Sequence, residues 1–369
     1  MRAAVFVAMM AMSVNAATLD DLLATATKLR KLDKDAETPS DQITFKHQLR
    51  DWIESRLPLG VTGNQLMMDV RTAGLESPDD IWELTLGYVT DIEITRPQNY
   101  PSAIAVRAAV SVSCGFDESW YIYVLTVTGW KRILEYERDT PLVNSEIEVA
   151  PADRDGSRLV LITGNHPACV SRFNVMQYRA FRISPFSPAR TLLDGNREMD
   201  WNKDHRSATL TNSEITMEFE SCCSEQGQTN RTVVLKHRID GERTVRVDPV
   251  ALNPQDFVDE WVHQSWAEMQ NWTARDSRAR LEKWHKKAGG DKWILPEFKF
   301  VQRCSRPGQW QIAAADIEGE RTDYFLVSES TGGRYEMLDI STKRQPGCPG
   351  ETPPDFTIRS VFTKPAERP

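Results

Sequence analysis

Two cysteines stand side by side in the stretch Glu220-Ser-Cys-Cys-Ser-Glu-Gln-Gly227. Adjacent sulfurs could bind a metal ion, act as a redox switch, or form two separate cross-links. Consecutive Cα atoms lie about 3.8 Å apart, below the usual disulfide range of about 4.4 to 6.8 Å, so a bond between Cys222 and Cys223 would be strained. The pair closes a predicted strand, in which neighbouring side chains leave opposite faces. We therefore expect each sulfur to reach a different partner.

The predicted disulfide framework uses all six cysteines of the chain: Cys114, Cys169, Cys222, Cys223, Cys304 and Cys348. An even number in an exported chain favours disulfides, with free structural thiols as the alternative. Cys304 and Cys348 bracket one repeat unit, and an even number of strands between them would return the chain to its start, so we expect them to pair. Closing a loop of about 45 residues is worth about 4 kcal/mol. We expect Cys222 and Cys223 to bond Cys114 and Cys169, which lie in loops of the same kind, in an order that the sequence leaves open.

Metal or cofactor chemistry has little support in the sequence. A metal site at the paired cysteines would need both thiols on one side, with His205 or His237 joining them. The chain has no HExxH, GxSxG, P-loop, GxGxxG or CxxC motif, and its six histidines are dispersed. We therefore predict no metal site and no cofactor, and the sequence assigns no catalytic residue.

Two groups of carboxylates invite a functional interpretation. Asp117 and Glu118, near Trp120, suggest a sugar-cleaving pair, but adjacent residues on a strand diverge, whereas a glycosidase needs converging carboxyl groups. A solvated loop is the favoured interpretation. Asp153 and Asp155 precede Gly156 as in a calcium loop, yet the position that needs a glutamate is Ile162, so we predict a hairpin-type turn.

Three further sites are candidates for binding or modification. His166 is a lone histidine, predicted in a loop, and we expect a structural role for it. Asn230-Arg-Thr232 and Asn271-Trp-Thr273 both match the N-glycosylation sequon. Asn271 is expected on a helix near its apolar face, which disfavours its modification.

The start of the chain predicts export. Arg2, an apolar run over residues 3–12 and the small residues of Val14-Asn15-Ala16 are typical of a signal peptide over 1–16. The chain carries 45 Lys and Arg against 53 Asp and Glu, a net charge of −8, which argues against nucleic acid or an anionic membrane surface as the main partner. No later run of 18 apolar residues predicts a membrane span. We expect a periplasmic or extracellular protein that is soluble after signal cleavage.

The elements that carry these residues divide into helices and strands. Helical spacing predicts an N-terminal helical segment over 17–78, with one helix capped by Thr18, one starting at Ser40 and stopped by Pro58, and one ending at Gly74. From about residue 82 the period changes to two. Four passages then share a layout of strand, polar loop, strand, tight turn and strand, with turns at Gly129, Pro185, Gly241 and Gly333.

These passages predict a mainly β fold made of antiparallel meander units, either a propeller-like repeat or stacked sheets. We divide the chain into a β-meander domain of three units over 79–252, a helical insertion over 253–290, a fourth unit over 291–345 and a proline-rich tail over 346–369. The insertion should begin with Asn253-Pro254 as N-cap and N1, carry a wide apolar face up to Trp272, and end with a second helix at Gly289-Gly290. Its tryptophans fit core packing better than a binding platform.

Two functions fit these observations. The favoured one is a non-catalytic binding or scaffold protein of the cell envelope or extracellular space, whose partner would be a protein or a glycan. The alternative is a secreted, glycan-directed hydrolase that uses carboxylates brought together by the fold. The sequence does not determine the oligomeric state.

Overall fold

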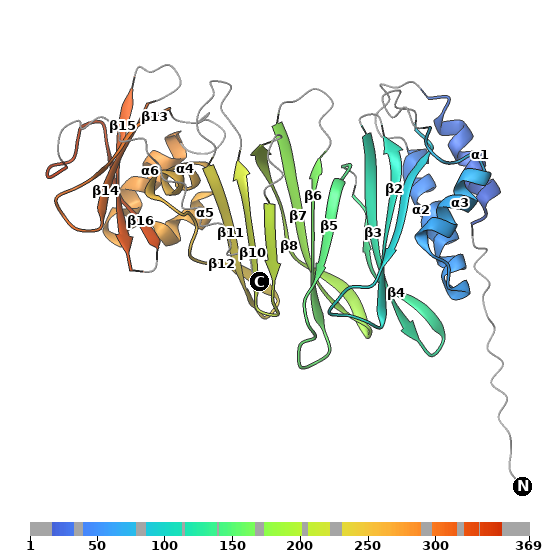
Figure 1. Ribbon diagram of the computed structural model, residues 1–369. Helices are drawn as coiled ribbons and strands as arrows, with labels where there is room; N and C mark the ends of the chain where they lie inside the picture. Colours follow the sequence, from blue (N-terminus) through green and yellow to red (C-terminus); the bar gives the residue numbers. More distant parts are fainter. Residues whose placement is uncertain are drawn as a thin grey trace, which may run out of the picture. The chain divides into compact units, whose positions relative to one another are not determined.

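The computed structural model describes residues 17–32, 40–78, 86–112, 115–138, 140–166, 173–200, 206–221, 231–288, 297–315, 321–331 and 333–348 (Figure 1). The chain forms two compact units: the first takes residues up to 201 together with 210–212, and the second takes 202–209 and everything from 213 onward. The predicted signal peptide at 1–16 and most of the proline-rich tail lie outside the described residues.

The described strands form four antiparallel sheets, each built from four consecutive strands, which confirms the predicted mainly β fold of meander units. The first unit holds β1 (Val89–Thr95), β2 (Ala103–Val112), β3 (Gly115–Thr126), β4 (Gly129–Tyr136), β5 (Val143–Val149), β6 (Arg158–His166), β7 (Phe173–Ser184) and β8 (Ser187–Asp200). The second holds β9 (Arg206–Leu210) except its last residue, β10 (Glu214–Ser221), β11 (Arg231–Asp240), β12 (Arg243–Arg246), β13 (Glu297–Arg303), β14 (Gln309–Ala315), β15 (Thr322–Ser330) and β16 (Arg334–Ser341).

Three helices cover one face of the β1–β4 sheet: α1 (Leu19–Leu29), α2 (Ser40–Arg56) and α3 (Gly63–Thr72) (Figure 1). Thr18 and Thr62 cap α1 and α3 with capping boxes. In each box the threonine hydroxyl accepts a hydrogen bond from the backbone amide of the third helical residue, and the side chain of that residue accepts one from the threonine amide. The helix α2 ends before Pro58, as predicted, because proline has no backbone N–H to continue the helix. The chain tightens there into a 3₁₀ turn, η1 (Leu57–Leu59). The N-terminal helical segment is confirmed.

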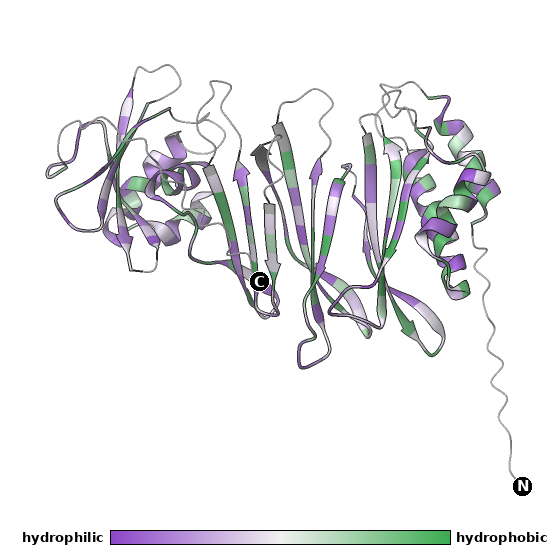
Figure 2. Ribbon diagram, viewed as in Figure 1, coloured by the Kyte–Doolittle hydropathy of each residue, from purple (hydrophilic) through white to green (hydrophobic). Residues whose placement is uncertain are grey.

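The β1–β4 sheet is buried on both faces. Its odd-numbered β3 residues, such as Tyr121 and Tyr123, join the core under the helices, while the even-numbered Trp120 and Ile122 join the core shared with the β5–β8 sheet. This double coverage explains why β2 and β3 are buried almost throughout rather than in strict alternation, although β3 also carries hydrophilic residues (Figure 2).

In the second unit the predicted helical insertion is present, but its first helix is broken. The helix α4 (Pro254–His263) is capped by Asn253 and begins with Pro254, as expected. It ends before Gln264, whose backbone is extended, and the chain restarts as α5 (Trp266–Met269) and η2 (Gln270–Trp272) before η3 (Arg275–Ser277) and α6 (Arg278–Ala288). The helical spacing of apolar residues continues across this break in the sequence, because α4 and η2 both face one core.

That core joins α4 to the β13–β16 sheet and buries Phe257, Trp261, Val262, Met269 and Trp272. The tryptophan stripe is therefore mainly core, as the sequence favoured. The helix α4 also contacts β11, so it is covered on two sides within this unit (Figure 1). Burial on both sides explains why even its acidic residues are inaccessible to solvent.

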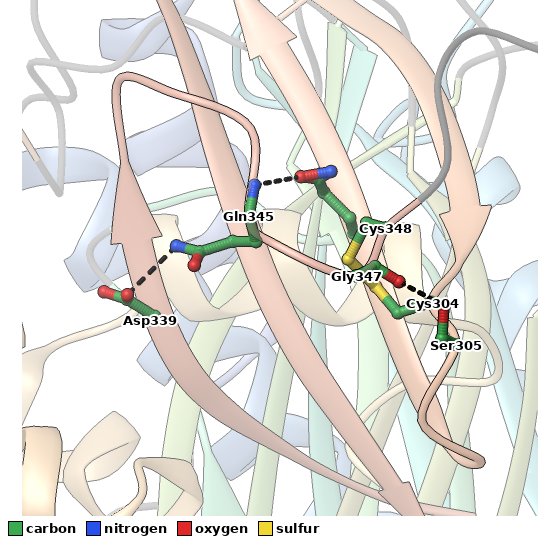
Figure 3. The surroundings of a disulfide bond; sticks show 7 residues. Cys304, Ser305, Asp339, Gln345, Gly347 and Cys348 are labelled. Carbon is green, nitrogen blue, oxygen red and sulfur yellow. Dashed lines mark hydrogen bonds between the residues drawn. A yellow bond between two sulfur atoms is a disulfide. The ribbon is translucent and has the colours of Figure 1, made fainter.

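The disulfide predicted between Cys304 and Cys348 is present (Figure 3). The expected reason for it was wrong, because three strands rather than an even number lie between the two cysteines: β14, β15 and β16. The chain returns instead through residues 342–348, where the Gln345 amide donates to Oε1 of Gln311 and the Ser305 amide donates to the carbonyl oxygen of Gly347. The disulfide fixes the end of this return.

The predicted layout of each unit named three strands, and the structure adds a fourth at the start of each sheet: β1, β5, β9 and β13. The predicted boundaries after residues 78, 252, 290 and 345 all fall between described elements. The division into domains, and the choice between a propeller-like repeat and stacked sheets, stay predictions.

Candidate functional site

Asp117 and Glu118 do not lie in a solvated loop, and that prediction was wrong. They are part of β3, and the two residues are 5% and 4% exposed. The strand runs further toward its start than expected, because Phe116 and Gly115 continue the pairing with β2. The side chains of Asp117 and Glu118 were predicted to point in different directions. Their hydrogen-bond partners lie on different elements, which is consistent with this.

The carboxylate of Asp117 is held between a helix and a loop. Lys46 of α2 donates from Nζ to Oδ2 at 3.0 Å, and the Leu142 amide donates to Oδ1 at 3.0 Å. Burial raises the pKa of the Asp117 carboxyl, while Lys46 and these hydrogen bonds oppose the rise. Both oxygens are occupied, so the side chain acts as a joint between α2, β3 and the segment before β5.

Glu118 has a different set of partners. The amide and hydroxyl of Ser145 donate to its Oε2 at 2.6 and 2.5 Å, and Arg107 donates to Oε1 at 3.3 Å. Burial raises the pKa of the Glu118 carboxyl against these contacts. Trp120 donates its indole N–H to the Ser145 hydroxyl at 2.6 Å, so all three residues of the suspected sugar site contribute to structural contacts. The pair does not form a glycosidase site.

A histidine and two glutamates gather where α2 meets β4. The ligand atoms of His47, Glu135 and Glu137 lie within 4.8 Å of one another. Each carboxylate oxygen already has a partner: Arg50 and Arg132 bind Glu135, while Tyr121 and His47 bind Glu137. Two arginines beside Glu135 also oppose a cation. We assign no metal to this cluster.

The Asp153 and Asp155 turn is a hairpin connection, as predicted. It joins β5 to β6, and the Gly156 amide closes it by donating to the carbonyl oxygen of Asp153 at 2.9 Å. Asp155 accepts from the amide and hydroxyl of Ser157 at 2.9 and 2.6 Å, which lowers the pKa of its carboxyl. The carboxylate thus stabilises its own turn.

Two other candidate residues take positions that differ from expectation. His166 is the last residue of β6 rather than part of a loop. Asn271 is exposed in η2 and does not face the core, although Thr273 of the same sequon is fully buried and receives a hydrogen bond from the Trp261 indole. The backbone turns at η2, which places the two ends of the sequon in different surroundings. Asn230, His205, Cys114, Cys169, Cys222 and Cys223 lie outside the described residues.

Two neighbouring hairpins of the first unit expose large apolar side chains at their tips. Strands β3 and β4 are joined by the two-residue turn Val127-Thr128, and β7 and β8 by Pro185-Phe186. Val127 and Phe186 are 105% and 89% exposed, the two highest values among the exposed large hydrophobic residues of the described chain. We call these two residues the apex pair.

Contacts between loops gather the turns of this unit at one end of its sheets (Figure 1). Lys131 donates from Nζ to the carbonyl oxygen of Pro185 at 2.8 Å, which joins the two apex hairpins. Arg158 donates to the carbonyl oxygen of Asn99 at 2.6 Å and stacks on Tyr100, which joins the β1–β2 turn to the β5–β6 hairpin. We call the segments 96–102, 126–131, 150–158 and 184–190 together the turn end.

The turn end is basic, although the chain as a whole is acidic. It contains five basic residues, Arg96, Lys131, Arg154, Arg158 and Arg190, and two acidic ones, Asp153 and Asp155, for a net charge of +3 against −8 for the chain. The uneven distribution makes this the best candidate for a binding surface in the first unit.

The sequence reasoning located the two apex turns but missed their significance. Two-residue hairpin turns favour glycine, asparagine and aspartate, and the β11–β12 turn follows this rule with Gly241-Glu242. Val127 and Phe186 do not have the positive φ that this preference serves, so they are distinguished by their exposure and not by their turn geometry. A large apolar residue at the tip of a predicted hairpin was the signal that could have indicated this surface.

In the described part of the chain, no helix is both long enough and apolar enough to span a membrane. No protein-family model matches the chain, and a comparison with the curated proteins finds no match.

Proposed function

We propose that this chain is an exported, non-catalytic protein that binds a partner through the turn end of its first unit. The apex pair carries this proposal. Val127 and Phe186 expose apolar surface to water, which is unfavourable. A binding role accounts for the exposure of both side chains, because the partner would remove them from water.

The carboxylates that first suggested catalysis support the same conclusion. Asp117 and Glu118 are buried and bonded to neighbouring elements, so they hold the fold together rather than face a substrate. A secreted glycan hydrolase, which is the alternative, would need another pair of carboxylates. Lys131, Arg154 and Arg96 of the turn end fit recognition of an anionic surface better than acid catalysis.

Export is supported by the leader-like residues at the start of the chain and by the disulfide between Cys304 and Cys348. Disulfides persist in oxidising compartments and are rare in a reducing cytosol. N-terminal sequencing of the protein recovered outside the cytosol should begin at Ala17. Recovery of the uncleaved chain in the cytosol would contradict this part of the proposal.

Site-specific photo-crosslinking tests the binding surface. The photoreactive residue p-benzoylphenylalanine is placed at Phe186, at Val127 or, as a control, at Met68, an exposed apolar residue of α3. Illumination in the native compartment should yield adducts, to protein or lipid, from Phe186 and Val127 and not from Met68. Equal adducts at all three positions, or none at the apex pair, would refute binding through the turn end.

A further inference from the structure

We infer that the partner bound by the turn end is the surface of an anionic phospholipid bilayer. This inference rests on the proposed binding function and adds the chemical class of the partner. It starts from the distribution of side chains at the turn end, where protruding apolar residues are combined with a surplus of positive charge.

The apolar residues of the turn end protrude at hairpin tips and do not form a flat patch. Val127 and Phe186 each occupy a two-residue turn, and the neighbouring Thr126, Thr128, Ser184 and Ser187 are small and polar. Shallow insertion of apolar side chains, about 5 to 10 Å into the boundary between headgroups and acyl chains, fits such tips. The hydrogen bond from Lys131 to the carbonyl oxygen of Pro185 joins the two hairpins, so both tips can reach the same surface.

The size of the apolar surface also favours lipid over protein. A stable protein–protein interface buries about 800 Å² on each partner with a well-packed apolar centre. Val127, Phe186 and the nearby exposed Leu125 do not supply such a centre. A bilayer needs no matching shape, because its hydrocarbon is fluid and accepts separate side chains.

The charges of the turn end select an anionic membrane. Lys131, Arg154 and Arg96 are exposed at the same end as the apex pair, where lipid phosphates and anionic headgroups would lie after insertion. The net charge describes the chain as a whole, whereas the field that a membrane meets is local and falls off within about 10 Å at 0.1 M salt. The turn end is therefore attractive to an anionic surface in spite of the net charge of −8.

Comparable turns in the second unit provide a contrast. The β11–β12 turn is Gly241-Glu242, and the β15–β16 connection contains Gly333. These turns expose no large apolar side chain. The apex pair is thus a local departure and not a general property of the meander hairpins described here.

Co-sedimentation of the mature full chain with vesicles tests the inference. The probes are vesicles of equal parts phosphatidylcholine and phosphatidylglycerol, compared with vesicles of phosphatidylcholine alone. We expect binding to the mixed vesicles, weaker binding to the neutral ones, and a loss of affinity as salt is added. Absence of sedimentation with the anionic vesicles would overturn the inference.

Matched variants identify the surface. Val127→Ser and Phe186→Ser should each weaken binding about tenfold or more, since each removes an inserted apolar side chain, while Met68→Ser should bind as the unmodified protein does. Arg154→Glu should weaken binding to anionic vesicles several-fold, and Lys31→Glu, on the helical side, should not. Equal binding by Phe186→Ser and Met68→Ser would overturn the inference. Crosslinks from the apex pair to a protein, without vesicle binding, would overturn the lipid partner and leave the proposed binding function in place.

Discussion

Lys46 and Asp117 form an ion pair of 3.0 Å between α2 and β3, with side chains that are 6% and 7% exposed. The two residues are 71 positions apart in the sequence, so the pair fixes the N-terminal helices to the first sheet through a buried polar contact. The same helix also pairs Arg50 with Glu135 of β4. Charged residues thus join the helical segment to the sheet beside the apolar core.

The substitution Lys46→Met should destabilise the protein strongly. It leaves the Asp117 carboxylate buried without its cation, which typically costs about 3 to 5 kcal/mol. The double variant Lys46→Met with Asp117→Asn should recover most of this loss, because the asparagine oxygen can still accept from the Leu142 amide. Urea unfolding of the single and double variants measures the difference. Equal losses in both would contradict the assigned role of the pair.

The pH dependence of Lys46→Met provides a second test. Burial already raises the pKa of the Asp117 carboxyl, and removal of the lysine should raise this pKa further. A folded-state pKa above the unfolded value of about 3.9 means that stability falls as pH rises through the interval between them. The variant should therefore approach the unmodified protein in stability toward about pH 4. A loss that stays constant with pH would contradict this explanation.

In the second unit, Arg246→Met should be destabilising for a similar reason. Nη1 of Arg246 lies 2.6 Å from Oε1 of Glu260 and also forms an ion pair with Glu268. Glu260 is fully buried. Loss of the guanidinium leaves a buried carboxylate without its cation, which typically costs about 3 to 5 kcal/mol. The exposed helical pair of Lys286 and Glu282 is the control, and Lys286→Met should cost less than about 1 kcal/mol. Similar unfolding midpoints in urea for both variants would contradict the prediction.

The disulfide should contribute to the stability of the second unit and not to that of the first. Replacement of both Cys304 and Cys348 by serine removes a cross-link that closes 44 residues, worth about 4 kcal/mol in the chain-entropy model. Each single serine variant should lose as much stability as the double variant, because either one breaks the bond. Hydrogen exchange should rise in β14 and stay unchanged in β2. A rise in β2 of equal size would contradict a local effect.

The sequence predicted the elements well where local chemistry determines them. Thr18, Asn253 and Pro58 have backbone preferences that act over one turn of chain, and the structure places helix ends at all three. The meander units followed from alternation and tight turns for the same reason. The break of the insertion at Gln264 could not be predicted, because the apolar spacing that suggests one helix is preserved across two short ones.

The candidate site was harder to predict because it depends on contacts between distant segments. Asp117 was expected in solvent, since its buried partner Lys46 lies far away in the sequence. The turn end likewise depends on the contact of Lys131 with Pro185, which are 54 residues apart. Composition gave the net charge of the chain but not its distribution in space. Long-range packing therefore decides which charged and apolar residues reach the surface.

His285 should make the stability of the second unit depend on pH. Its ring is buried among Trp261 and Trp266, and one ring nitrogen lies 3.1 Å from the carbonyl oxygen of Trp261. Burial lowers the pKa of this imidazole below the ordinary histidine value of about 6.5. Since the unfolded chain binds a proton at a higher pH than the folded chain, folding becomes less favourable as pH falls below about 6.5.

The variant His285→Phe keeps a ring in the cluster and removes the titrating group. The advantage in unfolding free energy of the unmodified protein over this variant should therefore shrink between about pH 7 and 5, by up to about 1.4 kcal/mol per pH unit. Urea unfolding at each pH measures it, and a difference that does not change with pH would show that His285 does not titrate in this way.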